Sequence, residues 1–230
     1  MKLLTFLLLA ASQALPQGRT AAAPQQSPSR IEIVLERQEG SNWSRIDPGL
    51  ILESSDRLRF RFKTNFGGYL YVMNYGTSGH YDLLFPREET GLQNRVEPGR
   101  DYQVPATQAW FRVAGPPGHD IVYWMVSPVA FDGGGDSSAG FAMPPSVARP
   151  PATLLPRCDD SILRARGLCI DSGAGPRNVA DDEQLPENLK HVPRVQSREL
   201  TIMRQKESST VSSPVPLSGP VIYEFRVAHR

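Results

Sequence analysis

The sequence lacks a charge imbalance, because its 230 residues include 25 basic and 24 acidic side chains and carry a formal net charge of +1. No global field is therefore available to attract a polyanion, and nucleic acid is not an expected partner. Histidine is scarce as well, with four residues scattered singly, and neither an H-E-x-x-H motif nor an EF-hand loop occurs. We therefore expect no metal site and no cofactor.

Long hydrophobic runs are missing except at the N-terminus, where Lys2 precedes an apolar stretch from Leu3 to Ala11. This pattern predicts a signal peptide over residues 1–14, with cleavage after Ala23 as the alternative. The stretch is about half as long as the roughly 20 residues that a membrane-spanning helix needs. The processed protein is therefore not expected to be an integral membrane protein, and we expect export to the periplasm or the extracellular space.

Residues 15–29 have no apolar periodicity and are rich in Pro, Gln, Ala and Ser, which is typical of a disordered linker. The remaining residues, 30–230, are predicted to form a single domain, since 40% apolar residues suffice for a sizeable core. The 21 prolines and 19 glycines favour short strands and turns over long helices.

Alternating apolar and polar residues predict strands at 31–36, 58–63 and 221–227, each with one buried face. Residues 69–73 and 121–126 are apolar or aromatic at every position, which predicts central strands covered on both faces. We expect about eight strands in an all-β fold, an antiparallel immunoglobulin-like β-sandwich.

The turns between these segments predict which strands pair. The expected antiparallel pairs are 69–73 with 80–85, 110–113 with 121–126, and a C-terminal hairpin of 200–203 with 221–227. A long Pro/Gly-rich insertion, 128–195, precedes that hairpin. Loops of this length are usually functional or disordered, and we expect only local order in it, from the cysteine pair and a short helix near 181–189.

Cysteine is nearly absent, and the two residues present, Cys158 and Cys169, are expected to form a disulfide in an oxidising compartment. A continuous helix would hold their Cα atoms about 16 Å apart, whereas a disulfide needs roughly 5.5 Å. The intervening segment must therefore fold back, with a short helical turn that Asp159 or Asp160 caps and Gly167 ends. Two free thiols are the alternative.

The block from Gly68 to Asn74, followed by Gly79 and by Leu83 to Pro86, resembles a bacterial family known only as domain of unknown function forty-three eighty-four. Similar features continue to the apolar strand that ends at Ser127, so the resemblance covers roughly residues 50–130. It implies a β-sandwich module of bacterial envelope or signalling proteins, and it brings no established active site.

Two features are candidates for binding. Arg57, Arg59 and Arg61 follow one side of a predicted strand together with Lys63, where they would meet an acidic partner or a glycan. A solvated face that keeps the sheet soluble is the alternative. Tyr75 stands beside a glycine at a strand end, where an exposed ring would stack on a sugar, with core packing as the alternative.

These observations favour a non-enzymatic interaction module of the bacterial envelope that binds a protein or glycan partner through its loops and its insertion. One alternative is a hydrolase that uses the insertion residues Asp136 and Ser137, although the sequence around them lacks the spacing of a nucleophile elbow. The other is a structural envelope component that self-associates through an exposed strand edge.

Overall fold

The computed structural model describes most of the chain from residue 27 onward. The described residues are 27–131, 144–146, 154–159, 161–165, 168–179, 185–190, 192–195, 197–213, 217 and 219–230. The predicted signal peptide and the linker up to residue 26 lie outside them, as do Asp136, Ser137, Asp160 and Gly167. Ser29, which the sequence placed in the linker, is already the first residue of a strand.

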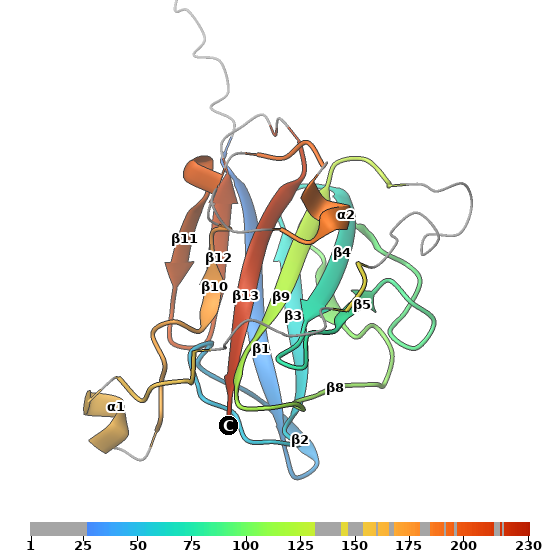
Figure 1. The fold of residues 1–230 in the computed structure, drawn as a ribbon. Helices are drawn as coiled ribbons and strands as arrows, with labels where there is room; N and C mark the ends of the chain where they lie inside the picture. Colours follow the sequence, from blue (N-terminus) through green and yellow to red (C-terminus); the bar gives the residue numbers. More distant parts are fainter. Residues whose placement is uncertain are drawn as a thin grey trace, which may run out of the picture.

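Two antiparallel sheets form a sandwich (Figure 1). In the first sheet the strand order is β11-β12-β1-β3-β7, with β2 paired to β1 and β8 paired to β3. Its strands are β1 (Ser29–Glu39), β2 (Asn42–Arg45), β3 (Arg57–Thr64), β7 (Asp101–Val104), β8 (Phe111–Arg112), β11 (Thr201–Arg204) and β12 (Ser209–Ser213).

In the second sheet the order is β10-β13-β9-β4-β5, with β6 paired to β4. Its strands are β4 (Gly68–Tyr75), β5 (Tyr81–Phe85), β6 (Arg95–Val96), β9 (Gly118–Ser127), β10 (Gly175–Arg177) and β13 (Val221–His229). Helices in the described part of the chain are short, namely α1 (Ser161–Ala165), α2 (Glu187–Lys190) and a 3-10 turn at Ser197–Glu199. The predicted all-β antiparallel sandwich is confirmed.

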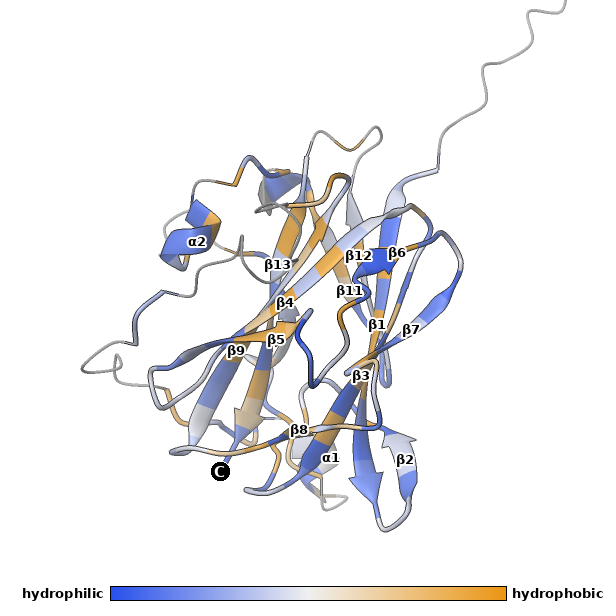
Figure 2. Cartoon of the chain, turned by 90° about the vertical axis from the view of Figure 1, so that its right-hand side faces the viewer, coloured by the Kyte–Doolittle hydropathy of each residue, from blue (hydrophilic) through white to orange (hydrophobic). Residues whose placement is uncertain are grey.

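The main core lies between the sheets and is built around Trp124 of β9, which is fully buried. Phe62 of β3 stacks on Trp124, with ring centroids 5.6 Å apart, and Phe60 meets it edge to face at 5.1 Å. Phe60 and Phe62 share a face because side chains two apart on a strand point the same way. In Figure 2 the hydrophobic residues accordingly gather on central strands such as β4 and β13, whereas β2 is mostly hydrophilic.

A second apolar cluster covers the outer face of the second sheet. Tyr71 of β4 and Met125 of β9 belong to the same buried cluster as Val179, Leu185 and Leu189 of the insertion. The prediction that β4 and β9 are covered on both faces is therefore confirmed. The expectation of only local order in the insertion is wrong, because its β10 also pairs with β13 and its α2 lies over the second sheet (Figure 1).

Two predicted pairings are wrong. Residues 110–113 do not pair with 121–126, because the ten-residue β9 is sandwiched between β4 and β13 while the two-residue β8 pairs with β3. Between them, Gly115 has a φ of 101° and a Cβ there would lie 2.7 Å from the Thr77 hydroxyl, so this crossing requires glycine.

The predicted hairpin of 200–203 with 221–227 is the other wrong pairing. β11 pairs with β12 at the edge of the first sheet, and β13 lies inside the second sheet between β9 and β10. The physical reason is burial. Both faces of β13 are covered, Phe225 on one and Ala228 on the other, so the prediction of a single buried face for 221–227 is wrong, whereas Met203 of β11 is about half exposed.

Candidate functional site

A pocket of about 570 Å³, here called the outer pocket, lies where the outer face of the second sheet meets the insertion. Tyr75 of β4 and Ile121 of β9 belong to the sheet side. The insertion side includes Leu154, Leu155 and Arg157. Its volume is within the roughly 300–1,000 Å³ that is typical of small-molecule and cofactor sites.

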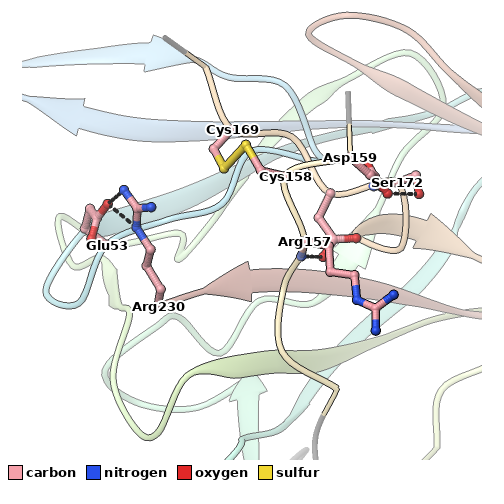
Figure 3. Close-up of a disulfide and its surroundings, with 8 residues drawn as sticks. Glu53, Arg157, Cys158, Asp159, Cys169, Ser172 and Arg230 are labelled. Atoms are coloured by element: carbon pink, nitrogen blue, oxygen red, sulfur yellow. Dashed lines mark hydrogen bonds and ion pairs between the residues drawn. A yellow bond between two sulfur atoms is a disulfide. The ribbon is translucent and has the colours of Figure 1, made fainter. Parts of the chain in front are cut away.

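The insertion side of the outer pocket is fastened by a disulfide. Cys158 and Cys169 are bonded, with their Cα atoms 4.9 Å apart, which confirms the predicted pair (Figure 3). The predicted short helix between them is also present, as α1. Asp159 plays another part than the predicted cap, since its carboxylate accepts hydrogen bonds from the Ser172 hydroxyl, at 2.5 Å, and from the Ser172 amide, at 3.1 Å. The bond from the Ser172 hydroxyl lowers the pKa of Asp159.

Asp171 joins this segment to the sheet. Its side chain is buried and accepts the backbone amides of Arg157, at 2.8 Å, and of Gly173, at 2.7 Å. The same carboxylate lies 3.2 Å from Nε2 of His119 on β9, and Nδ1 of His119 lies 3.1 Å from the Leu154 carbonyl. Both ring nitrogens therefore face acceptors within the protein. In this arrangement the ring holds the pocket wall in place and has no nitrogen free to serve as a general base.

The arginines that line the outer pocket differ in whether their guanidinium groups have a partner within the protein. Arg226 of β13 donates to the buried carboxylate of Glu224, at 2.6 Å. Arg157 and Arg177 are exposed, and their guanidinium groups have no hydrogen-bond or ion-pair partner among the described residues. In Figure 3 the Arg157 side chain extends away from the disulfide. Two cations are thus available to an external anion.

Tyr75, a predicted binding residue, lines the outer pocket and is half-buried. Its ring stacks on Tyr81 of β5, with centroids 4.3 Å apart and planes 17° apart. Burial raises the pKa of both phenols. Tyr75 therefore presents a neutral aromatic surface to the outer pocket, and Tyr81 packs against it from β5.

The predicted arginine row lies elsewhere, on β3 of the first sheet. Arg59 donates to the Glu36 carboxylate, at 2.5 Å, and covers the Trp43 ring, at 4.4 Å. Arg57 covers the Trp110 ring, at 4.5 Å. Arg61 has no partner among the described residues. The structure thus does not bring the row together with Tyr75, and it commits Arg57 and Arg59 to contacts within the sheet.

Sequence reasoning missed His119, Asp171, Arg157 and Arg177. A local signal existed only for Asp171, because Asp-Ser-Gly is turn chemistry in which an aspartate accepts the amide two residues on. Arg157 and Arg177 line the outer pocket only because of the tertiary fold. The disulfide at Cys158 holds the segment of Arg157 in place, and the pairing of β10 with β13 brings Arg177 to the second sheet.

The hydrolase residues Asp136 and Ser137 lie outside the described residues. Another serine does meet a histidine, since the Ser146 hydroxyl lies 2.6 Å from Nδ1 of His80. Both residues are exposed, and within the described ranges no carboxylate bonds to His80. The pair therefore lacks the orienting third group of a catalytic triad.

Among the described residues, no three His, Cys, Asp or Glu side chains are grouped closely enough to hold a metal ion. The described part of the chain also contains no helix of the length and apolarity needed to cross a membrane.

Fold and pocket together define a β-sandwich whose insertion forms one wall of a pocket. Residues 52–130 match the family described as Domain of unknown function (DUF4384), which confirms the resemblance drawn from the strand motifs. No curated protein and no solved structure matches the chain. The matched segment contains Tyr75, His119 and Ile121 of the outer pocket, whereas the disulfide segment that forms the opposite wall lies beyond it.

Proposed function

We propose that the protein is an exported, non-catalytic recognition module of the bacterial envelope that binds an acidic segment of a partner protein in the outer pocket. One observation carries this proposal: the unpartnered guanidinium groups of Arg157 and Arg177 line the same pocket as the rings and chains of Tyr75, Ile121 and Leu154. Guanidinium groups bind carboxylates through paired, charge-assisted hydrogen bonds.

The apolar rim favours a polypeptide over a glycan as the occupant. Leu154 and Leu155 are 76% and 65% exposed, although both line the outer pocket. Exposed apolar side chains grouped at a pocket are typical of protein interaction sites, because a partner covers them on binding. A segment that combines a carboxylate with an apolar side chain would satisfy both the arginines and the leucines.

A binding role rather than a catalytic one is supported by the use of the polar groups in the pocket. Asp159 and Asp171 accept hydrogen bonds from the protein itself, and both nitrogens of His119 face protein acceptors. No group in this part of the structure is positioned to activate a nucleophile.

Export is supported by the disulfide, which persists in oxidising compartments and is rare in the cytosol.

The proposal is tested with the processed, disulfide-bonded protein and a library of short fluorescent peptides that vary in charge and apolar content. We expect peptides with Asp or Glu next to Leu or Phe to bind, and Lys-containing counterparts of equal length not to bind. The double variant Arg157→Ala/Arg177→Ala should weaken binding at least about tenfold, since two charge-assisted bonds are lost. Equal affinity of the variant and the wild-type protein would overturn the proposal.

The matched control is Arg95→Ala, which removes an exposed arginine of β6 that does not line the outer pocket and should leave peptide affinity unchanged. Mass spectrometry of the bound peptide addresses the hydrolase alternative, because a cleaved peptide contradicts a non-catalytic role. Light scattering over a range of protein concentrations addresses the self-association alternative.

A further inference from the structure

The outer face of the first sheet carries arginines from four neighbouring strands. Side chains directly opposite each other in an antiparallel register lie on the same face of a sheet. Arg59 of β3 is therefore on the same face as Glu36 of β1, which in turn lies opposite Arg45 of β2. Arg57 of β3 likewise shares this face with Arg112 of β8. The strands thus form one surface, here called the arginine face, which comprises Arg45, Arg57, Arg59, Arg61 and Arg112.

Two of these arginines hold tryptophan rings on the arginine face. The guanidinium group of Arg59 lies 4.4 Å from the centroid of the Trp43 ring, and that of Arg57 lies 4.5 Å from the centroid of the Trp110 ring. Arg57 is fixed further by its hydrogen bond to the side-chain oxygen of Gln38, at 3.1 Å. Cation–π contacts of this kind restrain both rings. Trp110 nevertheless remains 43% exposed, so it offers a fixed aromatic surface to a ligand.

The other three arginines have unused guanidinium groups. Arg45 and Arg112 are exposed and Arg61 is partly exposed, and none of them has a hydrogen-bond, ion-pair or ring partner among the described residues. They belong to β2, β8 and β3, so their charges are spread over the sheet and do not converge on one point. Guanidinium groups bind carboxylates through paired, charge-assisted hydrogen bonds. This spread suits an extended chain with several carboxylates better than a single small anion.

The same face carries negative charge farther along β3. Glu32 of β1 and Asp101 of β7 lie on either side of Lys63 in the register, and both carboxylates are exposed. A nucleic acid has a phosphate on every nucleotide and would meet these like charges. A polymer whose carboxylates are separated by neutral sugars can place its charges at the arginines and its sugar rings on the tryptophans.

We propose that the arginine face binds an acidic polysaccharide, namely a chain in which uronic acid units alternate with neutral sugars. Arg45, Arg61 and Arg112 would bind the carboxylates, and Trp43 and Trp110 would stack on the apolar faces of the sugar rings. None of these residues lines the outer pocket. The proposal is therefore separate from peptide recognition there, and failure of either site leaves the proposal for the other untouched.

The test is isothermal titration calorimetry of the disulfide-bonded protein with a hyaluronan octasaccharide, in which glucuronate alternates with N-acetylglucosamine. Its carboxyl-reduced counterpart, in which each glucuronate has become glucose, should bind at least about tenfold more weakly. Absence of measurable hyaluronan binding would overturn the proposal, as would equal affinity for the reduced form. An oligothymidylate of similar length that binds as tightly as hyaluronan would also overturn it, because the face would then recognise polyanions in general.

Substitutions separate the roles of the arginines and the tryptophan. Arg61→Ala and Arg112→Ala should each weaken binding of the hyaluronan octasaccharide about fivefold and leave the affinity for the reduced form unchanged. Trp110→Ala should weaken both forms about fivefold, because stacking does not depend on the carboxylates. Arginine variants that bind hyaluronan as the wild-type protein does, or that weaken both forms alike, would contradict the assignment.

The matched control for the arginine face is Arg157→Ala/Arg177→Ala in the outer pocket. This variant loses two exposed arginines from the second side of the sandwich and should retain wild-type affinity for the hyaluronan octasaccharide. A loss equal to that of Arg61→Ala would show that binding follows overall charge and would overturn the proposal.

Discussion

The His119 imidazole and the Asp171 carboxylate lie 3.2 Å apart although 52 positions separate them in the chain. Their contact joins β9 of the sandwich to the disulfide-bonded part of the insertion. Asp171 also accepts two backbone amides of that segment, so one side chain organises an entire wall of the outer pocket.

Replacing Asp171 with alanine should lower the free energy of unfolding by about 2 kcal/mol, because the amides of Arg157 and Gly173 lose their acceptor. Urea denaturation followed by tryptophan fluorescence measures the change. Asp101→Ala is the control, since Asp101 is exposed and its contact with Lys63 spans 3.6 Å. The two variants should differ clearly, and equal stabilities would contradict this role of Asp171.

Replacing both Cys158 and Cys169 with serine should lower the free energy of unfolding by about 3 kcal/mol, because the unfolded chain regains the freedom of the closed loop. Circular dichroism should still report the sandwich, whose strands need no disulfide. Peptide affinity at the outer pocket should fall with stability, as the wall carrying Arg157 loosens. A variant that melts at the wild-type temperature would refute the stabilising part of this expectation.

Replacing Arg59 with alanine should destabilise the fold by about 1–3 kcal/mol, because the carboxylate of the buried Glu36, whose side chain is only 7% exposed, loses its ion-pair partner. Arg61→Ala, two positions along the same face of β3, should change stability by less than about 0.5 kcal/mol. Thermal unfolding of both variants side by side measures the difference. A similar loss for both would indicate that the arginine row acts as a unit.

Alkaline pH should destabilise the protein through its buried tyrosines. Burial raises the pKa of Tyr223 well above 10.0, and it also raises the pKa of Tyr75 and Tyr81. The unfolded chain therefore releases these protons first, so the contribution to stability is intact below about pH 10 and declines as pH rises above it. Urea unfolding at a series of pH values from about 9 to about 11 measures the decline.

Tyr223→Phe is the matched variant for this pH series. The Tyr223 hydroxyl has no hydrogen-bond partner among the described residues, so its removal should cost little stability at neutral pH. The variant should also lose less stability than the wild-type protein above about pH 10. An unchanged alkaline slope would show that other groups dominate the titration.

The faces of the strands were predictable from sequence, but their neighbours were not. Period-two alternation in β1 and β3 reveals which side chains are buried, because that depends only on the pleat. It contains no information on which strand lies alongside, and so the partners of β8, β11 and β13 were assigned wrongly. Turn residues such as Gly115 looked like a hairpin although they carry the chain from one sheet to the other.

The residues of the candidate site were likewise predictable from sequence only in part. Tyr75 was recognisable from its place at a strand end, and the cysteines from their spacing. Arg157, Arg177 and Asp171 were not recognisable, since each is an ordinary polar residue until the tertiary fold sets it beside β9. A binding role for Arg57, Arg59 and Arg61 stays a prediction.

The position of β13 bears on what counts as a modular unit in this protein. The segment that matches the family, residues 52–130, contains β3 to β9, yet the strands that flank β3 and β9 in the sheets, β1 and β13, come from the two ends of the described chain. Cut out alone, that segment would present two long unpaired edges and a bare aromatic core. We therefore expect the matched portion to need β1 and β13 in order to fold, because these two strands from outside it complete the sheets around β3 and β9.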